Sequence, residues 1–357
     1  MSLPDSPLAW ATNGTASLSD FGALSRGSSA PPWLIAAVIV TWPLPAGRLN
    51  VELISVSENA TFKVTTDGTP VMVVRLHQPG YVSSVDNVRS ELQWIEAVAA
   101  QADIRTPSPV RGLNGDLVQT LMGPHAAAWT AVAFEFAHGQ MLEDQADLTP
   151  HFTEIGRLTA SLHSHSRQWK RPAGFARFDW TIGDMVGPDA RWGRWEDHIM
   201  SGSDRRTIAA AETSALSVLS RLRRTSHNWG LIHGDLRPSN LLVTESGLTV
   251  IDFDDSGFSW YLHDFAAALT FYEHREIAQQ LATHWISGYR ETLALDRNDL
   301  ETAAALSLIR RLTMLGWATT HRADALPADL WDENLPGTVE VAARYLRHPL
   351  WLVEPVR

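Results

Sequence analysis

Carboxylate and amide side chains gather in two short segments of the chain, LIHGDLRPSNLLV (231–243) and VIDFDD (250–255). Asp235 and Asn240 stand five residues apart in the first segment, and Asp252 follows in the second. Apolar, β-prone residues flank both segments, so we expect a loop and a short hairpin, with the polar residues at the ends of buried strands. Transfer of a phosphoryl group from MgATP to a hydroxyl needs one carboxylate to orient and deprotonate the acceptor, and oxygen ligands for Mg²⁺.

The two segments resemble the motifs of aminoglycoside phosphotransferases and of choline and homoserine kinases, in the pattern His-Gly-Asp-x-x-Pro-x-Asn followed by Ile-Asp-Phe-Asp-Asp. Asp235 and Asn240 have the spacing of the kinase catalytic loop, and Asp252 occupies the downstream metal position. The resemblance runs from about Leu49 to the C-terminal helices. It implies an α+β, protein-kinase-like fold with a small β-rich N-terminal lobe and a larger, mainly helical C-terminal lobe. It also implies ATP and Mg²⁺ as cofactors, with Asn240 and Asp252 as metal ligands. A turn alone also favours Asp, Asn, Pro and Gly, but it would not require this whole set beside apolar strands.

The residues around Asp235 receive roles from this chemistry. Asp235 is the expected catalytic base, which orients the acceptor hydroxyl and takes its proton late, while the metal ion carries most of the charge stabilisation. His233 is expected to brace the loop by hydrogen bonding. Arg237 either neutralises charge that develops near the phosphate or forms a salt bridge with a surface carboxylate.

The chain after Asp252 favours a small molecule over a protein as acceptor. Asp254 and Asp255 stand where a protein kinase begins its long activation segment, and His263, just before a predicted helix, comes only eleven positions after Asp252. This distance leaves little room for a loop that docks a peptide.

Aromatic residues and carboxylates together could hold an ammonium group of the acceptor by cation–π and charge attraction. The aromatic residues are Trp180, Trp192 and Trp195 and the carboxylates are Asp179, Asp184 and Asp189, all in the insert before the catalytic loop. Asp254, Asp255 and Trp180 are the predicted substrate contacts. The alternative is that Trp180, together with Trp192 and Trp195, packs within an ordinary helical insert.

The hairpin loop SVSENATF (55–62) is expected, from the resemblance, to cover the phosphates of ATP. It has no glycine-rich pattern, so backbone amides together with Ser57, Asn59 and Thr61 would bind the phosphates. An ordinary polar hairpin would contain the same residues. The resemblance also places backbone groups of Glu135 and Ala137 at the adenine edge.

Arg75 stands where kinases carry the phosphate-binding lysine of a strand. Its planar guanidinium binds phosphate bidentately and remains charged, so the geometry differs from that of lysine while the cation is kept. Lys63 on the neighbouring strand is the competing candidate. Glu91, sixteen residues after Arg75 on a predicted helix, either orients Arg75 or is a surface residue.

Composition excludes several classes of function. The formal net charge of −11 argues against a nucleic-acid-binding surface and leaves room for an acidic pocket that attracts a cationic substrate. The chain has no cysteine, which excludes disulfides, thiol nucleophiles and cysteine-ligated zinc and suits the cytoplasm, the expected location. The apolar run 33–42 is far shorter than the roughly 20 residues of a spanning helix, so we expect a short buried helix beginning near Pro32 and no membrane association.

Hydrophobic periodicity divides the chain into a tail and two lobes. We expect a mobile tail at 1–30, a nucleotide-binding lobe at 31–137 and a helical catalytic and substrate lobe at 138–357, with a hinge at 137–139. Expected strands are 49–57, 60–66, 71–76 and 130–136, with Asp67-Gly68 as a hairpin turn. Expected helices are 84–100, 151–166, 207–224, 262–272, 276–293 and 299–320. Asp264 is expected to cap the fourth of these helices.

The sequence therefore predicts a kinase that transfers the γ-phosphate of ATP to a hydroxyl of a small, amine-bearing molecule: an aminoglycoside, an amino alcohol or a homoserine-like compound. Two alternatives stay open, a compact bacterial serine/threonine protein kinase and a nucleotide-binding module without catalysis. The missing glycine-rich loop and Arg75 suit the second alternative. The complete set of Asp235, Asn240 and Asp252 argues against it, because a binding module has no need of a base. The sequence does not reveal the oligomeric state.

Overall fold

The computed structural model describes Leu24 and residues 27–57, 59–77, 84–124, 127–321 and 325–354. The chain forms two compact units, the first made of Met1–Ala97, Thr106–His138 and Pro172–Ala176 and the second of Val98–Arg105, Gly139–Arg171 and Arg177–Arg357. The chain thus passes from the first unit to the second after His138, within the expected hinge. The expected tail lies largely outside the described residues, and residues 27–30 pair with the first strand of the sheet, through Gly27 N to Leu53 O at 2.8 Å and Ala30 N to Val51 O at 2.8 Å.

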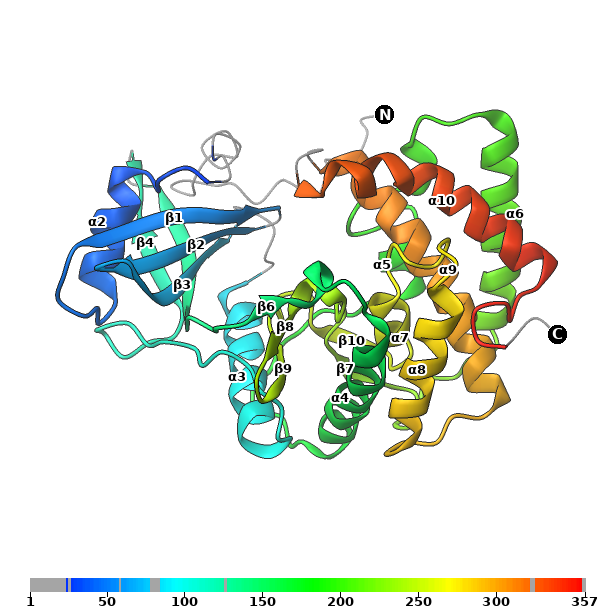
Figure 1. Ribbon diagram of the computed structural model, residues 1–357, viewed down its shortest axis with the longest axis horizontal. Helices are drawn as coiled ribbons and strands as arrows, with labels where there is room; N and C mark the ends of the chain where they lie inside the picture. Colours follow the sequence, from blue (N-terminus) through cyan, green and yellow to red (C-terminus); the bar gives the residue numbers. More distant parts are fainter. Residues whose placement is uncertain are drawn as a thin grey trace. The chain divides into compact units, whose positions relative to one another are not determined.

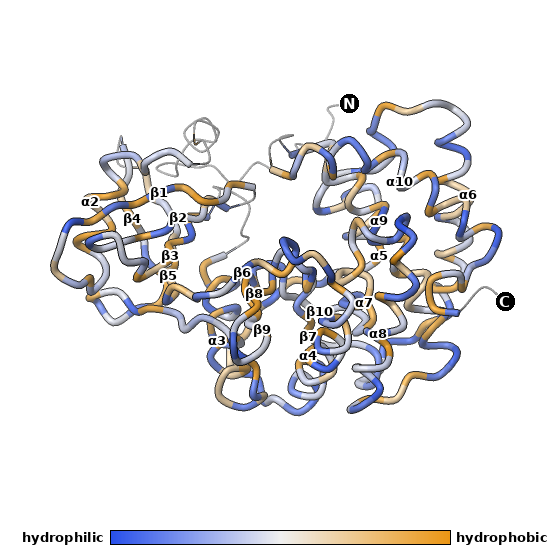
Figure 2. Tube along the Cα trace, in the orientation of Figure 1, coloured by the Kyte–Doolittle hydropathy of each residue, from blue (hydrophilic) through white to orange (hydrophobic). Residues whose placement is uncertain are grey.

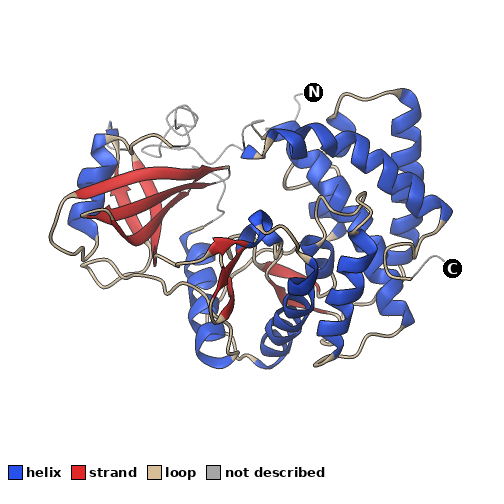
Figure 3. Cartoon of the chain, viewed as in Figure 1, coloured by secondary structure: helices blue, strands red, loops and turns tan. Residues whose placement is uncertain are grey.

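The first unit contains a five-stranded antiparallel sheet in the order β1-β2-β3-β5-β4 (Figures 1 and 3). Its strands are β1 (Leu49–Val56), β2 (Asn59–Thr66), β3 (Thr69–His77), β4 (Gln119–Met122) and β5 (Ala128–Glu135). The expected strands are confirmed, and β4 was not predicted. Asp67 and Gly68 form the two-residue turn between β2 and β3 with φ of 49° and 81°, the left-handed values that this turn requires.

Helix α2 (Pro32–Thr41) packs one face against the core of this sheet. Leu34 and Val38 are fully buried, whereas Ile39 and Val40 are 53% and 72% exposed, so the expected helix is present but is buried on one face only. Figure 2 shows the hydrophobic run of α2 in orange. Across the described ranges, no helix combines the length and the apolar character that crossing a membrane would require. Helix α3 (Val85–Gln101) follows and carries Glu91.

The second unit is mainly helical and holds two small sheets, β6-β8-β9 and β10-β7 (Figure 1). Its helices are α4 (Thr149–Gln168), α5 (Ile182–Val186), α6 (Gly202–Leu219), α7 (His263–Ala268), α8 (Ala278–Arg290), α9 (Arg297–Thr320) and α10 (Ala328–Arg347), with the single turns η2 (Leu142–Asp144), η3 (Trp195–Asp197) and η4 (Pro238–Asn240). Its strands are β6 (Gln140–Met141), β7 (Trp229–Ile232), β8 (Leu241–Thr244), β9 (Gly247–Val250) and β10 (Gly257–Trp260).

Three helical expectations need correction. Helix α6 lies five residues earlier than expected at each end, because the Ser201 side chain accepts the Asp204 amide and begins the helix there. Helix α7 ends at Ala268, four residues before the expected end, and the left-handed Phe271 (φ 70°) excludes its continuation. Helix α10 was not predicted, and it contains Pro336, a residue that normally interrupts helices.

Helices α4 and α8 cross at two glycines. A Cβ atom on Gly156 would lie 2.0 Å from the carbonyl oxygen of Trp285, and one on Gly288 would lie 1.9 Å from that of Thr153. Glycine is therefore required at both positions for the helix backbones to approach this closely. The crossing fixes α4, which carries His163 toward the catalytic loop.

Candidate active site

Asp235 lies in the loop between β7 and the turn η4, and Asn240 lies at the end of that turn. The side-chain nitrogen Nδ2 of Asn240 donates to the backbone oxygen of Asp235 at 2.9 Å and to the carboxylate Oδ2 of Asp235 at 2.8 Å. Because the nitrogen is used twice, the amide oxygen of Asn240 is turned away from Asp235. The pair thus presents a carboxylate and a separate neutral oxygen ligand.

The expected hairpin β8–β9 brings Asp252 to the same end as Asn240. Leu241 pairs with Val250, and the Ile251 amide donates to Asn240 O at 3.0 Å, so Asp252 follows directly after this contact. Asp252 is exposed and has a left-handed φ of 62°, a conformation uncommon outside glycine.

Asn240 and Asp252 fit a magnesium ion that arrives with a nucleotide. Mg²⁺ is commonly held by one or two protein oxygens, with substrate phosphates and waters completing its shell. Within the part of the chain that the structure describes, no group of three or more His, Cys, Asp or Glu side chains could hold a metal ion. The phosphates would therefore supply the remaining ligands.

His233 makes the bracing contacts that the sequence led us to expect. Its Nε2 donates to Ile251 O at 3.1 Å, and its Nδ1 accepts the Asp235 amide at 3.3 Å. The ring is fully buried, with its centroid 4.6 Å from that of Phe253. His233 therefore ties the catalytic loop to the segment that precedes Asp252, and a part in catalysis remains a prediction.

Two arginines contact the Asp235 carboxylate. Arg237 Nε lies 3.3 Å from Oδ2, so its partner is Asp235 and not a surface carboxylate. Arg310 of α9, which sequence reasoning missed, pairs with Oδ1 and is 1% exposed. Asp235 itself is 14% exposed and is held from both sides.

Asp264 accepts hydrogen bonds from backbone amides of the catalytic loop. The expectation that it caps its own helix is wrong. Its Oδ1 accepts the Gly234 amide at 2.8 Å, and its Oδ2 accepts the His233 amide at 3.1 Å. His163 Nε2 donates to the same Oδ2 at 3.1 Å, and its Nδ1 lies 2.9 Å from the hydroxyl of Tyr289. His163 therefore connects α4 to Asp264 and to Tyr289.

The electrostatics of this buried pair favour an ionised Asp264. Burial raises the pKa of Asp264, but the hydrogen bonds that it accepts from His163 and the Gly234 amide, with the electrostatic effect of the neighbouring imidazoles, outweigh burial and leave the pKa lowered. Burial lowers the pKa of His163, which opposes its protonation. The carboxylate is thus kept as an acceptor for the loop amides.

The Trp180 side chain, a predicted substrate contact, is fully buried and packs inside the protein. Its indole nitrogen donates to Asp255 O at 2.8 Å, and its ring packs edge-on against Trp192 with centroids 4.9 Å apart. The packing alternative is therefore correct for Trp180. Asp255 is 8% exposed, whereas Asp254 is half-buried and is the more accessible of the two carboxylates.

The first unit contains the expected pair of Arg75 and Glu91. Arg75 Nη2 lies 2.6 Å and 2.8 Å from the two carboxylate oxygens of Glu91, and the side chains are 5% and 1% exposed. Lys63 instead pairs with Glu52 at 3.4 Å on the sheet surface. Glu91 is therefore a buried partner of Arg75 and not a surface residue.

The phosphate-loop candidates lie on the same sheet. Thr61 is paired with Arg75 across β2 and β3, and Ser57 N donates to Asn59 O at 3.0 Å to close the β1–β2 turn. At the end of β5 the Glu135 amide donates to Ser108 O at 2.9 Å. The backbone carbonyl of Glu135 can therefore accept a hydrogen bond from the adenine of ATP. A backbone amide that donates to the adenine would have to come from a later residue such as Ala137.

Comparisons with known proteins agree with this architecture. Residues 51–296 match the phosphotransferase enzyme family. Amicoumacin kinase of Bacillus subtilis (strain 168) is 24% identical over 258 residues, 69% of this chain and 73% of that protein. The structure of a microcompartment-associated aminopropanol kinase has a TM-score of 0.79 and 31% identity and covers 89% of this chain and 98% of its own. Amicoumacin kinase hAmiN, in complex with AMP-PNP, Ca²⁺ and Ami, has a TM-score of 0.68 and 19% identity and covers 87% and 92%. The predicted kinase-like α+β fold is confirmed.

Proposed function

The chain belongs to the phosphotransferase enzyme family of small-molecule kinases, and within it we propose an ATP- and Mg²⁺-dependent kinase that phosphorylates the hydroxyl of a small amino alcohol. The observation that carries the proposal is the Asp235 carboxylate, which accepts a hydrogen bond from the side-chain nitrogen of Asn240, the residue proposed to offer its oxygen to the metal ion. The similarity to an aminopropanol kinase, at 31% identity over 98% of that chain, supports an amino alcohol as the acceptor.

In the proposed reaction the acceptor hydroxyl lies at Asp235 Oδ2. Its oxygen attacks the γ-phosphorus, the bond from that phosphorus to the bridging oxygen of ADP breaks, and the hydroxyl proton passes to Asp235. Arg237 stands 3.3 Å from Oδ2 and offers positive charge beside the reacting atoms. Asn240 and Asp252 would hold the magnesium ion, which would neutralise charge on the phosphates.

The nucleotide would bind through residues of the first unit. Arg75, fixed by Glu91, supplies a guanidinium to the phosphates, with Ser57, Asn59 and Thr61 on the neighbouring hairpin. The Glu135 carbonyl and the Ala137 amide would contact the adenine edge. On the acceptor side, Asp254 is the carboxylate that we propose for the ammonium group.

A protein acceptor is disfavoured by the segment after Asp252. Residues 257–260 form β10, which pairs with β7, and α7 begins at His263. The chain between Asp252 and α7 is thus part of the fold and offers no long docking loop.

An ADP-release screen tests the proposal. The panel contains aminopropanol, ethanolamine, choline, homoserine and representative aminoglycosides, and the Asp235→Asn variant is the blank. We expect release with an amino alcohol that exceeds the blank by about 10² to 10⁴ in turnover. Release that is equal in the variant, or absent with the whole panel, would contradict the proposal.

A further inference from the structure

Arg310 is enclosed within the second unit and touches the catalytic loop. Its Nη2 pairs with Asp235 Oδ1, its Nη1 donates to Gly234 O at 3.3 Å, and its Nε donates to Thr270 Oγ1 at 3.4 Å. Its guanidinium carbon lies 4.8 Å from the centroid of the Trp192 ring. With a side chain that is 1% exposed, Arg310 can act on a bound acceptor only through Asp235.

The two oxygens of Asp235 have different partners. Oδ1 is taken by the enclosed Arg310, whereas Oδ2 receives Asn240 Nδ2 at 2.8 Å and has Arg237 Nε at 3.3 Å. Fixing one oxygen from the buried side sets the plane of the carboxylate and the direction in which the other oxygen points. We infer that Arg310 is a positioning residue for phosphoryl transfer, which holds Asp235 so that Oδ2 meets the acceptor hydroxyl. This inference rests on the proposed function.

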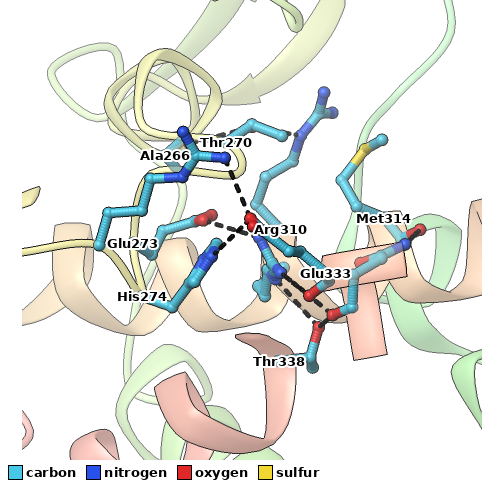
Figure 4. Close-up of polar contacts among 11 residues, drawn as sticks. Ala266, Thr270, Glu273, His274, Arg310, Met314, Glu333 and Thr338 are labelled. Atoms are coloured by element: carbon cyan, nitrogen blue, oxygen red, sulfur yellow. Dashed lines mark hydrogen bonds and ion pairs between the residues drawn. The ribbon is translucent and has the colours of Figure 1, made fainter. Parts of the chain in front are cut away.

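The neighbouring residue Arg311 contacts a different set of residues from Arg310. It points into a separate buried network, with Glu273 Oε2 at 3.1 Å, Thr338 Oγ1 at 2.9 Å and Asn334 O at 3.0 Å. Figure 4 labels Glu273 and Thr338 of this network, together with Arg310. Both side chains of the Arg311–Glu273 pair are 0% exposed. Two adjacent arginines are thus anchored to different partners.

The segment between the two networks is strained. Phe271 lies between Thr270, the partner of Arg310, and Glu273, the partner of Arg311, and it has a φ of 70°. Bulky residues rarely adopt this conformation, and it persists when the surrounding contacts over-determine it. The Arg311 guanidinium lies 5.3 Å from the Phe271 ring centroid, so the same network supports the strained residue.

Lysine cannot replace this guanidinium in function. A lysine keeps the positive charge that a buried carboxylate partner needs, but a compact ammonium cannot reach Asp235, Gly234 O and Thr270 together. Arg310→Lys therefore keeps the positive charge at this position but removes the simultaneous contacts of the guanidinium. Arg311→Lys is the matched control, because it changes an adjacent, equally buried arginine whose partners lie outside the catalytic loop.

The test combines steady-state kinetics with ATP and aminopropanol, nucleotide affinity by calorimetry with AMP-PNP, and thermal unfolding of each variant. We expect Arg310→Lys to lower kcat by about 10²-fold, the scale of a misplaced reacting group, with both KM values and the AMP-PNP affinity unchanged within about threefold. Arg311→Lys should lower Tm but keep kcat per folded molecule.

Four outcomes would overturn the inference. A wild-type kcat in folded Arg310→Lys contradicts the inference and leaves the proposed function standing. The same holds if both variants lose activity equally and in proportion to their unfolded fraction. A wild-type protein that turns over no acceptor of the panel contradicts the proposed function, and the inference with it. If Arg310→Lys does not fold, Thr270→Val removes one contact of the guanidinium, and an unchanged kcat in that variant would be equally contradictory.

Discussion

The side-chain amide of Asn240 donates to two oxygens of Asp235, the backbone carbonyl at 2.9 Å and the carboxylate Oδ2 at 2.8 Å. A single side chain therefore orients the proposed base, and its nitrogen is used in doing so. If Asn240 also holds the metal ion, as we propose, a change at Asn240 should affect both the base and the metal.

Replacing Asn240 by Ala tests that coupling. We expect kcat to fall by about 10²-fold, because the carboxylate loses its orientation, and the Mg²⁺ concentration for half-maximal rate to rise. A magnesium titration of the initial rate measures both effects. Ser239→Ala, at the adjacent position, is the control, and an unchanged magnesium dependence in Asn240→Ala would show that Asn240 holds no metal.

Replacing Glu91 by Gln tests the nucleotide side. The amide keeps the size of the side chain but removes the negative charge that fixes Arg75, so we expect the dissociation constant of AMP-PNP to rise by about tenfold. Calorimetry gives this value without any acceptor. Lys63→Gln changes the surface pair with Glu52 and should leave the affinity within about twofold. The reverse ranking would assign the phosphate contact to Lys63.

Replacing Asp264 by Asn tests the support of the catalytic loop. The variant keeps one acceptor oxygen for the amides of His233 and Gly234 and loses the charged one, which should lower the free energy of unfolding by about 2 kcal/mol. Chemical denaturation measures this loss. Asp204→Asn, which changes a half-buried carboxylate in the first turn of α6, is the control and should cost about 0.5 kcal/mol. An equal loss of unfolding free energy at both positions would contradict the supporting role of Asp264 in the catalytic loop.

The pH dependence of stability should reveal His263. Burial, reinforced by the positive charge of Arg310, lowers the pKa of His263 to about 3, from an ordinary value of 6.5. Below about pH 6.5 His263 of the unfolded chain binds a proton, whereas His263 of the folded protein does so only below about pH 3. The free energy of unfolding therefore decreases as the pH is lowered from about 6.5 to about 3.

Replacing His263 by Gln should remove this proton from the balance. Between pH 6 and pH 4 the free energy of unfolding should then fall less steeply than in the wild type, by about 1.4 kcal/mol per pH unit. Urea unfolding at several pH values measures the slope, with the exposed His227→Gln as the control. An identical slope in wild type and His263→Gln would contradict the buried, uncharged ring.

The sequence predicted the parts of the site that are close along the chain. Asp235, Asn240 and Asp252 lie within one loop and one hairpin, so their spacing alone places them together. Arg310 comes from a helix far along the chain, and no local pattern connects it to Asp235. The available signal was a pair of charges, Arg310 and Arg311, inside the largely apolar stretch 303–318 of α9, because a buried arginine requires a partner.

The fold shows the same division. Strong alternation and the Asp67-Gly68 turn made β1 to β3 predictable, whereas β4 has only four residues and takes its place from pairing with β5. Helix α10 was missed because Pro336 breaks its local pattern, while packing against other helices stabilises it. Asp264 was predicted as a helix cap because only its local sequence was considered. Its hydrogen bonds to His233 and Gly234 join residues about 30 positions apart, and no local pattern reveals them.

The most direct test of the central claim is to detect the phosphorylated acceptor. Wild-type protein and the Asp235→Asn variant are incubated with ATP, Mg²⁺ and aminopropanol, and the products are separated by mass spectrometry, while AMP-PNP binding confirms that the variant is intact. We predict phosphorylated aminopropanol with the wild type and a yield about 10² to 10⁴ lower with the variant. Equal yields from two proteins that bind AMP-PNP equally well would show that Asp235 does not carry the reaction.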